Sequence, residues 1–225
     1  MSFPDLGPLW LTVALASATT VCLLLLGTPL AWWLATTRSR LRPAVEAITA
    51  LPLVLPPTVL GFYFLLLMNP SSPLGRFWLQ LSGDSLSFSF SGLLIASIVY
   101  SLPFMVQPLQ RAFESVGLAP LEAAQSLRAS PFDAFLSVVM PLARRGFLSG
   151  AILAFAHTIG EFGVVLMVGG NIPGKTRLIS IQIYEHVETL NYTDAHVLSA
   201  IMLLFSFVVL LFVYARNGRG VVHAG

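Results

Sequence analysis

The sequence predicts an all-α integral membrane protein, because it is apolar, poor in charge and built of long unbroken apolar runs. Of its 225 residues, 56% are hydrophobic and 10% are charged, and the mean hydropathy is +0.83. Soluble domains carry about 25% charged residues. The apolar residues follow one another instead of alternating with polar ones, so the runs favour helices and exclude the strands of a transmembrane barrel.

Five runs have a length close to the ~20 apolar residues that a spanning helix needs. They cover residues 9–35, 47–68, 88–110, 147–168 and 197–214. No linker or change of composition divides the chain, so we expect one transmembrane domain over residues 1–225. The first run is too long for a secretory signal peptide, and no basic residue precedes Arg38. A single cysteine, Cys22, excludes an intramolecular disulfide.

The basic residues between the runs predict the orientation of the chain. Nine of them fall on one side of the five predicted spans: Arg38, Arg40, Arg42, Arg111, Arg128, Arg144, Arg145, Arg216 and Arg219. Only Arg76, Lys175 and Arg177 fall on the other side. Because cytoplasmic loops carry the excess of Lys and Arg, we expect the N-terminus outside and the C-terminus in the cytoplasm.

The segment 118–143 is patterned but too polar to cross a membrane, and the charge distribution predicts that it is cytoplasmic. Residues 120–127 have the spacing of a short helix, with Glu122 in its first turn, where the helix dipole favours an anion. Ser130 and Pro131 predict the N-cap and first residue of a second helix. Pro141 closes the segment before the basic pair Arg144 and Arg145.

Two interpretations of this segment stay open on pattern alone. Small residues at Ala123 and Ala124 permit close approach, while Phe132 and Phe135 are able to insert into a groove of a partner protein. An amphipathic helix that lies on the membrane surface uses the same kind of apolar face.

Four stretches resemble a known family. "EAAQSLRAS" followed by "VVMPLA" (residues 122–130 and 138–143) resembles the cytoplasmic E-A-A loop of ABC-importer permeases. The stretches 51–68, 101–116 and 160–177 are similar to the molybdate-permease branch of that family, and the resemblance covers residues 11–214. It implies that the loop is a coupling helix inserted into a cleft of an ATPase subunit. The residues that it assigns to docking are Glu122, Ala123, Ala124, Leu127, Arg128, Phe132, Phe135 and Pro141.

The chain departs from the family pattern at Arg128, where a glycine is usual. Glycine there would permit a positive φ between the two short helices. Arg128 therefore implies either a plain helical turn or a backbone cost, and a contact between its guanidinium and an acidic group of the ATPase is a further hypothesis.

Prolines and glycines within the spans are candidates for a gate or hinge, because broken helices often mark the moving parts of transporters. The candidates are the prolines and glycines Pro52, Pro56, Pro57, Gly61, Gly160 and Gly163, together with Glu161 between the last two. The alternative is that proline is simply more frequent in membrane helices than in soluble ones.

His157 and Glu161 are the ionisable pair inside the fourth predicted span, and their spacing places them on one helix face. Two ligands are too few for a tight metal site. We expect Glu161 to pair with Lys175 or Arg177, or to cap a broken helix at an outer gate, instead of taking part in translocation chemistry.

Residues 169–176, "GGNIPGKT", match the pattern of a phosphate-binding loop. A membrane span precedes them and no strand does, so we interpret them as a glycine-rich turn at the mouth of the fourth span. Lys175 and Arg177 are then outward-facing cations that are able to attract an oxyanion or the acidic rim of a binding protein, or that belong to an ordinary solvated loop.

The resemblance implies a homodimeric, non-catalytic permease subunit in the inner membrane that imports molybdate. Its expected partners are cytoplasmic ABC ATPase subunits and a periplasmic molybdate-binding protein, and we expect no catalytic residue, metal, cofactor or nucleic acid. Import of tungstate or sulfate is the alternative within the family. A passive anion channel and a membrane enzyme built on His157 and Glu161 are the alternatives outside it.

Overall fold

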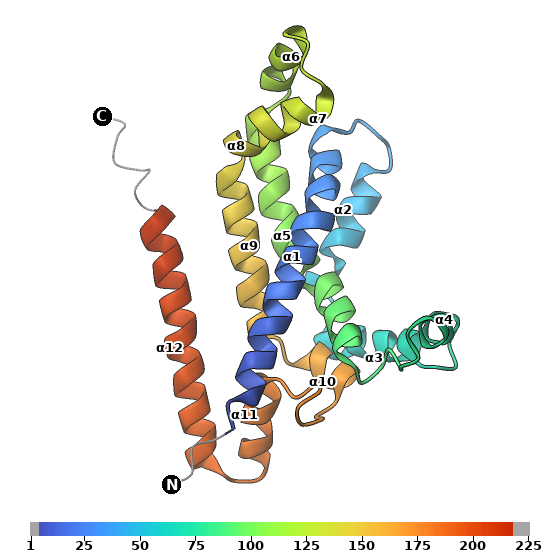
Figure 1. The fold of residues 1–225 in the computed structure, drawn as a ribbon, viewed down its shortest axis with the longest axis vertical. Coiled ribbons are helices and arrows are strands. Elements are labelled where there is room, and N and C mark those ends of the chain that lie inside the picture. The colour runs from blue at the N-terminus through green and yellow to red at the C-terminus, as the bar shows by residue number, and fades with distance from the viewer. Residues whose placement is uncertain (1–4, 218–225) are drawn as a thin grey trace.

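The computed structural model describes residues 5–217, and all the regular structure in that range is helical (Figure 1). Three helices are individually long and apolar enough to cross a membrane: α1 (Gly7–Thr36), α5 (Phe90–Val116) and α12 (Tyr192–Asn217) over its first 20 residues. Two bent helix pairs raise the number of candidate spans to five if each pair is one span. Arg219, one of the residues used to predict the orientation, lies outside the described residues.

The first and third predicted spans are single helices. α1 begins with Pro8 in its first turn, where the missing N–H of proline costs no helical hydrogen bond. α5 begins after Ser89, whose hydroxyl accepts a hydrogen bond from the Gly92 N–H. It ends at Val116, six residues beyond the predicted end of the third span, and Gly117, with φ 69°, follows as its C-cap. The extension, residues 111–116, includes Arg111 and Glu114, which therefore lie on the same continuous helix as the third predicted span.

The second predicted span is not one straight helix. Helix α2 (Arg42–Ala50) continues into the 3₁₀ turn η1 (Leu51–Leu53), and α3 (Pro57–Met68) then leaves at 107°. The cause is the Pro56–Pro57 pair. Pro56 is extended, with ψ 135°, because the ring that follows disfavours helical backbone, and neither proline has an N–H to donate.

The fourth predicted span is also interrupted. Helix α9 (Arg144–Ile159) ends at Gly160, and a new short helix, α10 (Gly163–Gly169), follows. The main-chain carbonyl of Glu161, which the break releases from helical bonding, accepts a hydrogen bond of 2.7 Å from the Ser180 hydroxyl. The break is therefore satisfied by another element, as a membrane environment requires.

Short helices connect the longer ones at the two ends of the bundle. At the end where α1 begins lie α10, α11 (Ile179–Glu188) and the start of α12, while α4 (Pro73–Ser82) projects from the side of the bundle after α3 (Figure 1). At the opposite end, α6 (Ala119–Ser126) and α7 (Pro131–Ala134) project beyond α1, α5 and α9. A π-helical turn η2 (Phe135–Val139) and α8 (Met140–Leu142) lead into α9, which is inclined by 74° to the segment before it.

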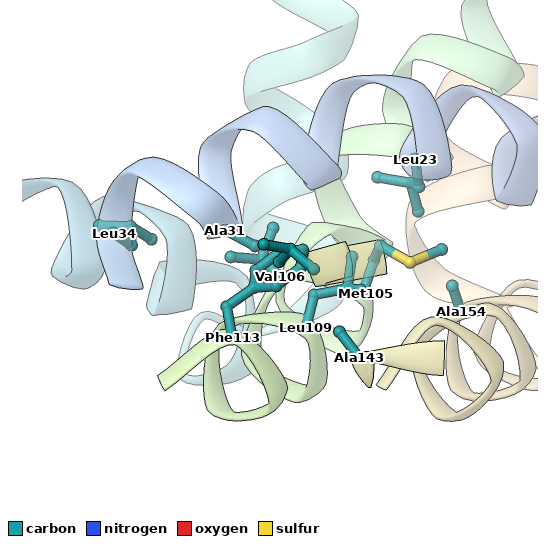
Figure 2. Close-up of a cluster of buried hydrophobic side chains, with 10 residues drawn as sticks. Leu23, Ala31, Leu34, Met105, Val106, Leu109, Phe113, Ala143 and Ala154 are labelled. Atoms are coloured by element: carbon teal, nitrogen blue, oxygen red, sulfur yellow. The ribbon is translucent and has the colours of Figure 1, made fainter. Parts of the chain in front are cut away.

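The largest apolar cluster joins α1, α5 and α9 (Figure 2). α1 contributes Leu23, Ala31 and Leu34, all fully buried, and α5 contributes Met105, Leu109 and neighbouring residues. Aromatic rings close the cluster near the α6–α7 end. The Trp32 ring centroid lies 5.3 Å from that of Phe113 and 5.2 Å from that of Phe135, each at a steep angle.

Small residues at every fourth position let α9 approach α5 closely. Gly146, Gly150, Ala154 and Thr158 are all buried. A Cβ added at Gly146 would lie 2.3 Å from the Cβ of Ala112, which is far inside van der Waals contact. This is the small-residue spacing that membrane helices use when their backbones touch.

The turn between α6 and α7 is a Schellman cap. The N–H of Arg128 donates to the carbonyl of Gln125 (2.9 Å), and the N–H of Ala129 donates to that of Ala124 (3.2 Å). Arg128 occupies the left-handed position, with φ 67°. Of the two possibilities for this residue, the structure therefore has the backbone cost and not the plain helical turn. The predicted start of the second helix is confirmed, because the Ser130 hydroxyl accepts from the Asp133 N–H.

We predict that Gly146→Ala destabilises the protein, because the new methyl group separates α9 from α5. Overpacking of this kind costs about 1–3 kcal/mol, which corresponds to a melting temperature in detergent lowered by roughly 2–10 °C. Gly160→Ala is the matched control, since its Cβ would have no neighbour closer than 3.7 Å. Equal shifts for the two variants would contradict close α5–α9 packing.

We also predict that Arg128→Gly stabilises the end of α6, because glycine adopts φ 67° without the cost of about 1 kcal/mol that other residues incur. Hydrogen exchange measured by mass spectrometry should show about fivefold greater protection of the amides in residues 124–129. Leu127→Gly is the control: Leu127 has φ −87°, so glycine there should reduce protection. Lower protection in Arg128→Gly would show that the arginine side chain outweighs the strain.

Candidate functional site

The loop formed by α6 and α7 exposes apolar side chains at the far end of the molecule (Figure 1). Leu127 is 85% exposed and Phe132 is 73% exposed. Glu122 and Ala123 are exposed on α6, whereas Ala124 is half-buried. Large apolar groups that project this far beyond the bundle indicate a surface that another molecule covers.

Phe135, which was predicted to belong to the same docking surface, is half-buried, unlike Phe132. Its ring packs between α1 and α5, 5.2 Å from Trp32 and 5.9 Å from Phe113. Ala134 beside it is fully buried. The two aromatic residues therefore have different roles: Phe132 faces outward, while Phe135 anchors the loop to the bundle. Pro141, in α8, is exposed.

At the other end of α9, a row of polar groups crosses the α5–α9 contact. The Ser97 hydroxyl donates to Oε2 of Glu161 (2.9 Å), and the Ser101 hydroxyl lies 2.9 Å from Nδ1 of His157. His157 also stacks on Phe104 with a centroid distance of 4.0 Å. Sequence reasoning missed both serines. Ser97 and Ser101 are four residues apart on an apolar helix, as are His157 and Glu161. This matching spacing is the sequence signal that would have identified the two serines.

Glu161 is buried, with 3% of its surface exposed, and it does not pair with Lys175 or Arg177 as the sequence suggested. Arg177 instead donates to Oδ1 of Asn171 (2.7 Å) and lies 3.3 Å from Glu185 on α11. Glu161 does not cap α10 either, since no side chain caps that helix. Its Oε1 atom is buried without a hydrogen-bond partner among the described residues.

A cavity of about 580 Å³ lies beside the break between α9 and α10. Four of the gate candidates line it: Pro57, Gly160, Glu161 and Gly163. A Cβ added at Gly163 would lie 2.8 Å from the Cβ of Pro57, so α3 touches α10 directly. Gly61 makes the next such contact, with Met167. Pro52 and Pro56 lie at the α2–α3 bend and do not line this cavity.

The residues that match a phosphate-binding loop form a closed turn. The Thr176 hydroxyl, which would hold a metal ion in a nucleotide site, is buried and donates to the carbonyl of Gly169 (2.6 Å). The N–H groups of Lys175, Thr176 and Arg177 all donate to the carbonyl of Ile172. These N–H groups and the Thr176 hydroxyl are therefore already occupied, in agreement with the interpretation as a turn.

Within residues 5–217, no group of three His, Cys, Asp or Glu residues is placed to hold a metal ion. The two polar pairs at the α5–α9 contact bring hydroxyl groups to His157 and Glu161 and supply no third ligand.

Comparison with known proteins agrees with this architecture. The molybdenum transport system permease protein ModB of Azotobacter vinelandii is 59% identical over 217 residues, which are 96% of each chain. A sulfate transport system permease protein, CysT of Synechocystis, is 32% identical over 84% of this chain and 65% of its own length. A bacterial alginate ABC transporter, solved in complex with a periplasmic protein that binds an alginate pentasaccharide, has the same fold. Its TM-score is 0.78 at 17% identity, over 97% of this chain and 80% of that chain.

The family model described as binding-protein-dependent transport system inner membrane component matches residues 27–218. That range includes the α6–α7 loop, both helix breaks and the α5–α9 contact. The chain therefore belongs to this family of multi-pass inner-membrane permease subunits.

Proposed function

We propose that this chain is the membrane-spanning subunit of an ATP-driven importer whose substrate is molybdate. The substrate is inferred from the difference in sequence identity between this chain and two related permeases. Identity with the molybdenum permease is 59% along almost the whole of both chains, but identity with the sulfate permease is 32%. Molybdate and tungstate have nearly the same size and charge, so tungstate is a competing substrate, and sulfate is a weaker one.

Separate ATPase subunits supply the energy, and they dock on the α6–α7 loop. The loop's exposed apolar residues, Leu127 and Phe132, fit a groove in a partner, and Ala123 permits close approach. Glu122, Ala124, Arg128 and Pro141 complete the docking region, and Phe135 supports it from inside. The closed turn at residues 169–176 supports the assignment of ATP hydrolysis to another chain.

In this proposal the loop faces the cytoplasm. Arg38 and Arg40 lie between α1 and α2, Arg128 lies between α6 and α7, and Arg144 and Arg145 begin α9; all five are exposed. These segments lie at the end of the bundle from which the loop projects (Figure 1). This end is cytoplasmic by the positive-inside rule, which places the N-terminus outside. Lys175, exposed at the opposite end, then faces the periplasm, where it attracts an oxyanion or a binding protein.

Two copies of the chain form the pathway, because a two-fold axis lets one subunit type enclose a channel. The bend at Pro56–Pro57 and the break at Gly160–Gly163 are the hinges of the outer gate. They meet where Pro57 of α3 contacts Gly163 of α10, so movement of α10 is passed directly to α3. ATPase closure moves the loop, and α9 transmits this movement from the loop to the gate.

The proposal is tested by uptake of radiolabelled molybdate into proteoliposomes that contain this chain, its ATPase and its binding protein. Uptake should require ATP inside the vesicles and should be blocked by excess tungstate but not by excess sulfate. Uptake without ATP would indicate a passive channel, and block by sulfate alone would indicate a sulfate importer. No uptake by an intact complex would overturn molybdate as the substrate.

We predict that Phe132→Asp releases the ATPase, because the carboxylate would enter an apolar cleft. Loss of a buried aromatic anchor costs about 2 kcal/mol or more, or roughly 30-fold in affinity, so co-purification and uptake should both be lost. Leu190→Asp is the matched control, since Leu190 is 72% exposed in the turn before α12 at the other end. Retention of the ATPase by Phe132→Asp would exclude this residue from the interface.

A further inference from the structure

One face of the second half of α5 carries two aromatic residues followed by three polar or charged residues. Tyr100, Phe104, Gln107, Arg111 and Glu114 are separated by four, three, four and three residues, so they form a single stripe. We name these five residues the α5 stripe. At 1.5 Å per residue it is about 21 Å long, which is most of the ~30 Å thickness of a hydrocarbon core.

Three cavities border the α5 stripe in succession. Tyr100 lines the cavity of about 580 Å³ at the α9–α10 break. Phe104, Gln107 and Arg111 line a second cavity, of about 250 Å³. Gln107, Arg111 and Glu114 line a third, of about 290 Å³. The second and third cavities share two residues, and the first is joined to the second through His157, whose ring contacts both Tyr100 and Phe104.

The charges along the stripe differ between the cavities. In the third cavity, Arg42 lies 2.9 Å from Glu46 and 2.6 Å from Glu114, and Gln110 donates to both carboxylates. One guanidinium therefore faces two carboxylates, and Arg111, which also lines this cavity, is the second cation there. In the second cavity, Arg111 is the one charged residue among apolar and amide groups, and it forms no ion pair within the described part of the chain.

An unpaired guanidinium beside an amide is a site for a small oxyanion. Arginine presents a planar set of N–H donors that matches the oxygen atoms of such an anion, and Gln107 adds a neutral donor. The remaining lining is apolar: Leu53, Pro103, Phe104, Pro108 and Leu153.

We propose that the α5 stripe is this chain's share of the anion pathway and that Arg111 with Gln107 binds a tetrahedral oxyanion transiently in its cytoplasmic half. The assignment rests on the proposed function. A single cation and a single amide hold a dianion weakly, which is what conduction requires. A second copy of the chain supplies the opposite wall and an equivalent Arg111.

The first test measures water access along α5. In a Cys22→Ala background, Gln107→Cys is compared with Val99→Cys, an exposed α5 position that lines none of the three cavities. The complex with its ATPase and binding protein is held in nanodiscs and treated with a charged, water-soluble thiol reagent. Gln107→Cys should react at least tenfold faster than Val99→Cys, and molybdate should slow that reaction. Equal rates, or reaction only with a lipid-soluble reagent, would overturn the pathway.

The second test removes the charge. Arg111→Gln should lower ATP-driven molybdate uptake at least tenfold, with the ATPase still bound and its hydrolysis still stimulated by the binding protein. Arg111→Lys should retain most uptake. Arg40→Gln, which removes an exposed charge outside the cavities, should behave as the unmodified chain does. Full uptake by Arg111→Gln would overturn this site, whereas no uptake by the unmodified chain would overturn the proposed substrate instead.

Discussion

The close contact between α5 and α9 is the interaction on which the rest of the structure depends. Within a bilayer, apolar surfaces gain nothing by leaving lipid, so helices associate through tight packing and hydrogen bonds. Gly146 and Gly150 bring the two backbones together, and the serine pairs to His157 and Glu161 extend the contact toward the break. The same contact fixes the rotation of α5, and this rotation turns Gln107 and Arg111 toward their cavities.

The two interruptions of the predicted spans are consequences of the same constraint. A break in a membrane helix leaves main-chain groups without partners, and it persists only where the protein supplies them. At the α9–α10 break, the Ser180 hydroxyl takes the freed carbonyl of Glu161. At the α2–α3 bend, the prolines remove the donors themselves, and α3 is held by its contact with α10 at Gly61 and Gly163. Each break is therefore supported by the other parts of the fold.

The α6–α7 loop shows how far local pattern carries a prediction. The Ser130 cap, the Pro131 start and the position of Glu122 in a first turn depend on neighbouring residues alone, and the structure has all three. The backbone of Arg128 was left open by the sequence, because an arginine is compatible with either a helical or a left-handed turn. The paired bonds of the Schellman cap decide for the left-handed form. Phe132 and Phe135 belong to one predicted stripe, yet Phe135 turns inward because Trp32 and Phe113 offer it an aromatic pocket.

Sequence by itself determined the membrane class, the all-helical fold, the family resemblance and the polar loop, because these depend on composition, on run length and on short patterns. Tertiary structure alone decided which polar groups meet. Glu161 is bonded to Ser97, 64 residues away, and Arg177 is bonded to Asn171 and Glu185 instead of to Glu161. The α5 stripe is visible as a pattern, but its cavities are not. Which side chains become hydrogen-bond partners depends on how each helix is rotated and how far apart the helices lie. Packing between segments that are far apart in the chain determines both.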